Sequence, residues 1–111
     1  ACVYTSPQAA WVGFDSRLKG MLSEGKCEIS KSFYLANAKA QADGATAGFV
    51  KLVSESGSGK ILAASVFGED ACELISIFTL AISEGISKAN LAGAMFPHPT
   101  LSELVSAACR D

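Results

Sequence analysis

The chain has 111 residues, half of them hydrophobic, and a formal net charge of −2 at pH 7. This length suits one domain with a single hydrophobic core. The charge balance gives no basic surface for nucleic acid or an anionic membrane, and no apolar run is long enough to span a bilayer. We therefore expect one folded domain, residues 1–111, without a nucleic-acid or membrane partner.

Five segments have the composition or alternation of β-strands. They are residues 2–5, 10–14, 28–35, 48–53 and 60–67. Between the second and third, Asp15 is predicted to cap a helix that Gly25 ends. Residues 36–47 are ambiguous between a helical turn and a loop.

The last two strands are predicted to form an antiparallel hairpin, because the connection between them contains Gly57 and Gly59. A phosphate-binding loop would need G-x-x-x-x-G-K-[ST]. Gly59-Lys60 is followed by Ile61, and no glycine stands five residues before Gly59, so the turn is favoured.

Helical patterns follow at residues 70–85, 87–94 and 101–109. In the first, Asp70 with Glu73 resembles a capping box. Ile77 and Leu80 fall outside the wide apolar face of this helix. They form either a second contact surface, such as a subunit interface, or a surface that another part of the domain covers, and the pattern leaves both open.

Strands dominate the first part of the chain and helices the last, with no regular βαβ alternation. This order predicts an α+β fold, in which helices pack on an antiparallel β-sheet. The chain begins without Met in an extended segment, and we expect it to be a piece of a longer protein.

The four cysteines, at positions 2, 27, 72 and 109, form no C-x-x-C pair and lack zinc-site spacing. One histidine and scattered acids are too few for a metal cluster, so we expect no metal site. Without a secretory signal, four reduced thiols are favoured over disulfides. We expect a cytoplasmic location, or the mitochondrial matrix in a eukaryote.

The only histidine, His98, is closely followed by Glu103 in the run His98-Pro99-Thr100-Leu101-Ser102-Glu103. Histidine changes charge near neutral pH, and a carboxylate within reach favours its protonated form. Pro97 and Pro99 restrict the backbone on both sides. His98 and Glu103 are therefore a candidate proton-transfer pair.

A structural explanation competes for Glu103. Thr100-Leu101-Ser102-Glu103 matches the capping box [ST]-x-x-[DE], in which Thr100 caps the last helix and Glu103 accepts a hydrogen bond from the Thr100 amide. His98 would then be a loop residue without a chemical role. The pattern alone does not separate these two explanations.

Three motifs in order resemble a known family. They are residues 3–13 (VYTSPQAAWVG), residues 68–75 (GEDACELI) and residues 98–103 (HPTLSE). Together they resemble the C-terminal dimerisation (interface) domain of the FAD-dependent pyridine nucleotide-disulfide oxidoreductases. The Leu-Ser pair in the third motif is similar to the dihydrolipoamide dehydrogenase branch.

The resemblance implies a two-fold homodimer in which each domain serves the partner subunit's flavin and redox disulfide. His98 would be the acid–base residue and Glu103 would orient its ring. The main chain of His98 and Pro99, joined by a cis peptide, would lie near the partner's FAD. The implied interface residues are Glu73, Ile77, Leu80, Phe96, Pro97 and Pro99.

The resemblance also implies FAD and NAD in the full-length enzyme and the nucleotide-binding domains of the parent chain as neighbours. A 2-oxo acid dehydrogenase or glycine cleavage complex is a further implied partner. This chain has no G-x-G-x-x-G motif and no closely spaced cysteine pair, so we expect it to bind no cofactor and to be inactive alone.

Two departures stand out: Gln8 replaces the usual Glu, and Pro97 replaces a common Ala. The alternatives are a non-catalytic self-association module of this fold and the same domain from a glutathione reductase-like enzyme.

Overall fold

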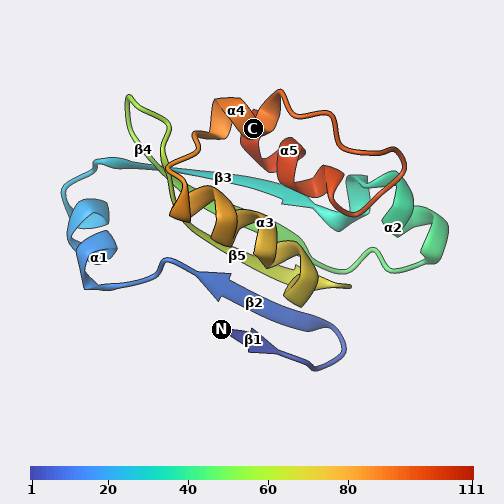
Figure 1. Ribbon diagram of the computed structural model, residues 1–111. Helices are drawn as coiled ribbons and strands as arrows, with labels where there is room; N and C mark the ends of the chain where they lie inside the picture. The colour runs from blue at the N-terminus through green and yellow to red at the C-terminus, as the bar shows by residue number, and fades with distance from the viewer.

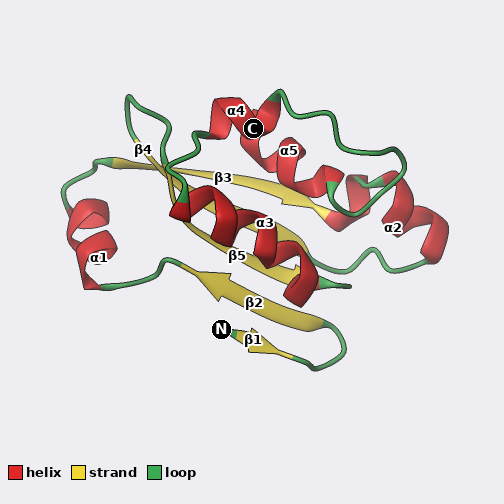
Figure 2. Cartoon of the chain, in the orientation of Figure 1, coloured by secondary structure: helices red, strands yellow, loops and turns green.

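The computed structural model describes all of residues 1–111 and shows a five-stranded antiparallel sheet with helices packed on it (Figures 1 and 2). The strands are β1 (Cys2–Val3), β2 (Gln8–Val12), β3 (Cys27–Phe33), β4 (Phe49–Glu55) and β5 (Ile61–Gly68), in the sheet order β1-β2-β5-β4-β3. The helices are α1 (Ser16–Ser23), α2 (Ala38–Asp43), α3 (Ala71–Ser83), α4 (Lys88–Ala92) and α5 (Glu103–Arg110), and a 3-10 turn, η1 (Tyr34–Ala36), follows β3. The expected α+β architecture is confirmed.

The main core lies between one face of the sheet and helices α3, α4 and α5. In Figure 1, α3 crosses β5 and β2, whereas α5 lies over β3 and β4. Leu52 of β4 and Phe78 of α3 are fully buried in this core, as is Val105 of α5. The apolar face predicted for the first of the three helical segments is therefore the buried one.

A smaller core lies on the opposite face of the sheet, under α1. Val53 follows Leu52 directly, and successive strand residues point to opposite faces. Val53, Ala63 and Leu18 of α1 form a separate buried cluster. Helix α1 begins as expected, because the Asp15 carboxylate accepts a hydrogen bond of 2.9 Å from the Leu18 amide.

Strand β3 presents its polar side chains to the helices. Ser30 and Ser32 are buried, whereas Ile29 and Phe33 are about half exposed. The Ser32 hydroxyl donates to the Leu104 carbonyl of α5 at 2.7 Å. The alternation predicted the strand, but hydrogen bonding to α5, and not apolar burial, fixes which face turns inward.

The segment after β3, ambiguous in sequence, forms η1 and α2. Tyr34 is completely buried, and its hydroxyl donates to the Glu69 carbonyl at 2.6 Å. Its ring occupies the space beside Gly68, where an added Cβ would lie 2.5 Å from a ring carbon. Gly68 also has φ +148°, a backbone conformation that favours glycine.

Helix α3 corrects the predicted start of the first helical segment. Asp70 has φ +57°, and its side chain makes no capping hydrogen bond. The side-chain oxygen of Gln8 instead accepts from the Cys72 amide at 3.0 Å. Gln8, a residue of the distant strand β2, therefore provides the capping acceptor that was predicted for Asp70. With 13 residues, α3 is the longest helix, and no helix has the length and hydropathy needed to cross a bilayer.

Candidate functional site

The structure brings His98 and Glu103 into contact, as the sequence predicted for a proton-transfer pair. His98 lies on the loop between α4 and α5, and Glu103 begins α5. Nδ1 of His98 lies 2.9 Å and 3.1 Å from the two carboxylate oxygens of Glu103. When Nδ1 carries a proton, it donates a hydrogen bond to the carboxylate. Nε2 is then the ring nitrogen that can accept a further proton. The side chain of His98 is 71% exposed, so its ring is open to solvent.

Glu103 also accepts a hydrogen bond from the Thr100 amide, at 3.0 Å. One carboxylate therefore contacts both the His98 ring and the Thr100 backbone amide. The predicted cap by Thr100 is wrong: its hydroxyl donates to the Pro97 carbonyl at 2.7 Å. The helix starts after Ser102, whose side chain makes no capping bond.

These contacts hold the pKa of Glu103 below its ordinary value of 4.5. The hydrogen bond from the Thr100 amide is the largest cause. The hydrogen bond and charge of His98 and the charge of Arg110 act in the same direction, and partial burial opposes them. Glu103 is therefore an anion at neutral pH.

A cavity of about 370 Å³ lies beside the pair, and β3, η1, α2 and α5 contribute to it. Besides His98 and Glu103 it is lined by Ser32, Phe33, Ala36, Asn37, Ala38, Leu104, Ala107 and Arg110. Phe33 and Arg110 are exposed at its rim, and His98 remains open to solvent. The cavity and the exposed ring of His98 therefore form one continuous open surface region.

Sequence reasoning missed Asn37. Its side-chain NH₂ group donates to the Thr100 carbonyl at 3.0 Å, and its side-chain oxygen caps α2 through the Ala40 amide at 2.9 Å. An Asn before a run of helix-forming residues is a capping signal. The bond to the Thr100 carbonyl joins residues 63 positions apart and leaves no local signal.

The six predicted interface residues lie on two elements. Glu73, Ile77 and Leu80 are on α3, whereas Phe96, Pro97 and Pro99 are on the loop that holds His98. Glu73 and Pro99 line one hollow of about 300 Å³, which brings the start of α3 close to the loop. The structure therefore places Glu73, at the N-terminal end of α3, near Pro99 of the loop.

Ile77 and Leu80 have different surroundings. Ile77 is half-buried and packs against the main core, so the domain itself covers part of it. Leu80 is 61% exposed and has no such cover. Phe96 is half-buried against the same core, and Pro97 and Pro99 are exposed beside His98.

The cysteines take no part in the pair. All four are free: Cys2 is exposed, Cys27 half-buried, and Cys72 and Cys109 buried. Burial raises the pKa of the Cys109 thiol to about 11, so the only cysteine of α5 is a protonated thiol at neutral pH and a poor nucleophile. No group of three or more His, Cys, Asp or Glu side chains is placed to hold a metal ion.

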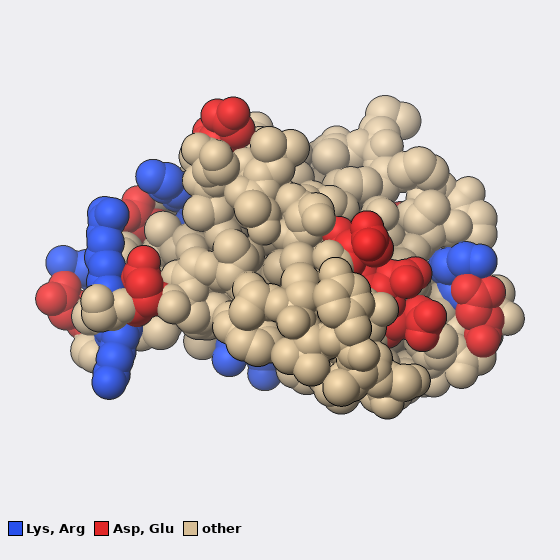
Figure 3. All heavy atoms as spheres, turned by 60° about the horizontal axis from the view of Figure 1, so that its bottom comes forward, with Lys and Arg blue, Asp and Glu red and all other residues tan.

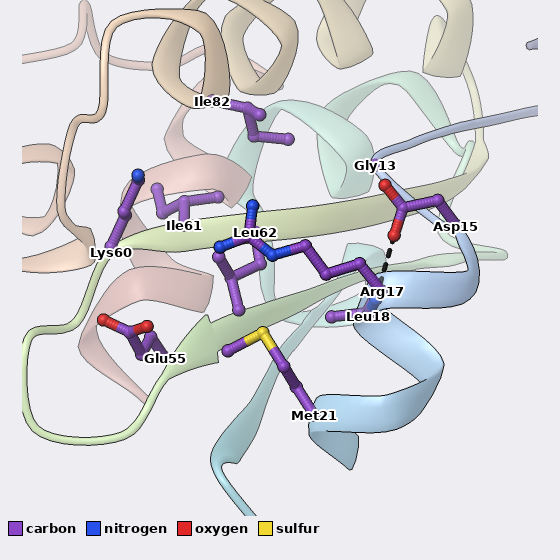
Figure 4. A pocket seen from close by; sticks show the side chains of 10 residues that line it. All are labelled: Gly13, Asp15, Arg17, Leu18, Met21, Glu55, Lys60, Ile61, Leu62 and Ile82. Carbon is purple, nitrogen blue, oxygen red and sulfur yellow. Dashed lines mark hydrogen bonds between the residues drawn. The ribbon is translucent and has the colours of Figure 1, made fainter. Parts of the chain in front are cut away.

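A second cavity, of about 210 Å³, lies between α1, the β4–β5 hairpin and the end of α3 (Figure 4). Its charged lining residues are Asp15, Arg17, Glu55 and Lys60. Asp15 is already engaged in capping α1, as the dashed line in Figure 4 shows. This cavity contains none of the predicted site residues.

Comparison with known proteins gives a consistent result. The model of the pyridine nucleotide-disulphide oxidoreductase dimerisation domain matches residues 1–109. The dihydrolipoyl dehydrogenase of Chlorobaculum parvum is 40% identical over 105 residues, which are 94% of this chain and 22% of that protein. The mitochondrial dihydrolipoyl dehydrogenase of Caenorhabditis elegans is 38% identical over 103 residues, which are 91% of this chain and 20% of that protein. The chain thus spans about a fifth of the length of these relatives.

Solved structures share the fold. LpdA from Mycobacterium tuberculosis superposes with a TM-score of 0.88 at 27% identity, covering 99% of this chain and 24% of that one. The flavoprotein disulfide reductase RclA from Escherichia coli has the same TM-score at 22% identity, covering 99% of this chain and 25% of its own, and supports the fold alone. With the family model matching almost every residue, the chain belongs to the family of pyridine nucleotide-disulphide oxidoreductase dimerisation domains.

Proposed function

We propose that this domain supplies the acid–base pair of a dihydrolipoyl dehydrogenase-type disulfide oxidoreductase. The observation that carries the proposal is the contact of 2.9 Å between Nδ1 of His98 and the Glu103 carboxylate, on a ring that is open to solvent. The relatives that match this chain bear the name dihydrolipoyl dehydrogenase, and each is several times longer than the chain. The remainder of such an enzyme would hold the groups that His98 serves.

The chemistry assigned to His98 is proton transfer with a thiol. A thiolate, and not a thiol, attacks a disulfide, so a dihydrolipoyl dithiol must lose a proton to react. Nε2 of His98 would take that proton while Nδ1 keeps its hydrogen bond to Glu103. The carboxylate would stabilise the resulting imidazolium and hold the ring in position.

In the full-length enzyme, FAD and NAD would accept the electrons that leave the dithiol. No Gly-rich nucleotide loop is present in this domain, so other domains would hold both cofactors. The loop around His98 and Pro99 is exposed and suits the proposed approach to the partner subunit's flavin. The domain alone would be inactive.

The proposed assembly is a homodimer, with interface residues Glu73, Ile77, Leu80, Phe96, Pro97 and Pro99. Exposed Leu80 and the exposed prolines beside His98 support it. Larger assemblies would be 2-oxo acid dehydrogenase or glycine cleavage complexes. The location would be the cytoplasm, or the mitochondrial matrix in a eukaryote.

The test is His98→Gln in the full-length protein. We expect dithiol turnover to fall by about 10²- to 10⁴-fold, the usual contribution of a positioned acid–base group, with FAD absorbance unchanged. Glu103→Gln is the companion variant. A Gln oxygen still accepts from the Thr100 amide but carries no charge, so we expect slower turnover in a correctly folded protein.

A non-catalytic self-association module is the second candidate, favoured by the exposure of Leu80. Normal turnover by His98→Gln, or a parent chain without a redox cysteine pair, would establish the module in place of the acid–base role.

A further inference from the structure

Asn37 is a buried residue whose side-chain amide makes hydrogen bonds through both its oxygen and its nitrogen. Its exposed fraction is 8%. The side-chain oxygen accepts from the Ala40 amide at 2.9 Å, and the side-chain nitrogen donates to the Thr100 carbonyl at 3.0 Å. A backbone N–H can only donate, so the bond to Ala40 fixes which end is the oxygen. The NH₂ group must therefore face Thr100.

Thr100 is also the residue that holds Glu103. Its amide donates to the Glu103 carboxylate at 3.0 Å, and the same oxygen lies 2.9 Å from Nδ1 of His98. One peptide segment thus connects the buried amide of Asn37 to the exposed imidazole through consecutive hydrogen bonds.

The bond from Asn37 is the one hydrogen bond that ties residues 94–101 to an element other than α4 or α5. The bond between Thr100 and Pro97 lies within the loop and moves with it. Phe96 and Leu101 pack against the main core, but apolar packing has no directional preference that would orient a carbonyl group.

We propose that Asn37 is a positioning residue for the proton-transfer pair. By binding the Thr100 carbonyl, it holds residue Thr100 in place, so that the Thr100 amide can hold Glu103 and Glu103 can orient His98. This inference rests on the proposed function of His98. Asn37 touches neither substrate nor the reacting nitrogen, and acts through Thr100 and Glu103.

The two bonds of Asn37 can be separated by substitution. In Asn37→Asp the carboxylate still caps α2, but a carboxylate oxygen faces the Thr100 carbonyl and repels it. In Asn37→Ser the hydroxyl caps α2 and is too short to reach Thr100. Asn90→Asp is the matched control, because the Asn90 side chain also accepts hydrogen bonds at a helix start, that of α4, and makes no hydrogen bond to the His98 loop.

In the full-length protein, we expect both Asn37 variants to lower kcat for dithiol oxidation by about 10-fold or more, since small misplacements of catalytic groups cost rates of this order. KM and FAD absorbance should stay within twofold of the parent's, and Asn90→Asp should behave as the parent does. A second readout is the ¹³C chemical shift of the Glu103 carboxyl group. Its pKa should rise toward the ordinary value in both variants, because the Thr100 amide is no longer held against it.

Parent-like kcat and Glu103 titration in both variants, beside an inactive His98→Gln, would overturn this inference and leave the proposed function intact. An equal loss of kcat in Asn90→Asp, or loss of FAD, would overturn it as well, because the effect would then be general destabilisation. If His98→Gln keeps normal turnover, the proposed function fails, and the Glu103 titration still decides whether Asn37 positions the pair.

Discussion

Glu103 has two hydrogen-bond donors on the loop that precedes it, the Thr100 amide and Nδ1 of His98. A carboxylate has enough lone pairs to accept both. The same group therefore orders the backbone of the loop and fixes the orientation of the imidazole ring. Stability of the loop and the proton affinity of the pair are linked through one side chain.

The lowered pKa of Glu103 predicts how stability depends on pH. Above the ordinary carboxyl pKa of 4.5, Glu103 is ionised in the folded and unfolded states, and its stabilising contribution is complete. As the pH falls below that value, the unfolded state binds the proton first, and the contribution is lost as the pH passes the lower folded-state pKa. Thermal unfolding of the parent and Glu103→Gln, measured between about pH 6 and pH 3, should show a shallower acid decline in the variant.

Glu28→Gln is a suitable comparison. Glu28 is an exposed acid whose carboxylate lies 3.6 Å from Nζ of Lys88, and this carboxylate accepts no hydrogen bond from a backbone amide. Its acid decline should follow the parent's. Parallel curves for all three proteins would contradict the assigned role of the Thr100 amide.

At this scale the sequence predicted the partners but not the geometry. The short spacing made Glu103 a candidate partner of His98, and the capping-box pattern predicted that its carboxylate accepts from the Thr100 amide. The direction of the Thr100 hydroxyl depends on the loop's path toward Pro97. The bond from Asn37 depends on tertiary structure, so no local pattern contains either one.

Helix α3 depends for its start on the neighbouring strand β2. The Gln8 oxygen accepts from the Cys72 amide at 3.0 Å, whereas Asp70 makes no side-chain cap. Free amides at a helix start need an acceptor. The β2 strand thus stabilises a helix that begins far along the chain.

Gln8→Ala should lower the free energy of unfolding by about 1 kcal/mol, the typical effect of losing a capping acceptor. Chemical unfolding monitored by circular dichroism measures it. Gln8→Glu keeps the acceptor and should remain near the parent. Asp70→Asn is expected to change little, and a larger loss for Asp70→Asn than for Gln8→Ala would refute this assignment.

Most element boundaries followed from sequence because turn residues and alternation act locally. Asp15 capped α1 as expected, and the hairpin formed around Gly57 and Gly59. Local patterns did not determine which face of β3 turns toward the core. Ser32 points inward because its hydroxyl donates to the Leu104 carbonyl of α5. Local patterns also left the segment of α2 open between a helical turn and a loop, because its six residues give too short a pattern.

On the scale of the whole domain, several large apolar side chains remain exposed, on both sides of the sheet. Phe33, Phe49 and Phe67 are cross-strand neighbours on the sheet face opposite the main core. Leu80 projects from α3 on the other side. Figure 3 shows a face with a broad area free of charged side chains between an acidic group and a mixed group. Such surfaces are typical of domains that contact other domains or subunits.

Leu80→Glu should weaken self-association. Placing a charge at the centre of an apolar contact typically costs ~2 kcal/mol, or about 30-fold in the dissociation constant. Sedimentation velocity of the full-length protein over a concentration series measures this. Leu22→Glu on α1 changes another exposed Leu outside the proposed interface and should leave the dimer intact. An unchanged dimer in Leu80→Glu would remove α3 from the interface.

Fold class was predictable from element order, and the family from three motifs that the family model and the relatives confirm. The sequence did not predict that the start of α3 and the His98 loop line one hollow, because the residues that line this hollow come from separate segments of the chain. The exposure of Leu80 likewise needed the complete packing of the domain.

Strand β3 and the residues that follow it make three hydrogen bonds to α5 and to the residues that flank it. The Lys31 amide donates to Asp111, the Ser32 hydroxyl to Leu104, and the Asn37 side chain to Thr100. These bonds set the axial position of α5 without any contribution from residues 93–95, where Met95 is almost fully exposed. The exposed Met95 side chain would therefore be a suitable place to attach a reporter group without shifting the histidine.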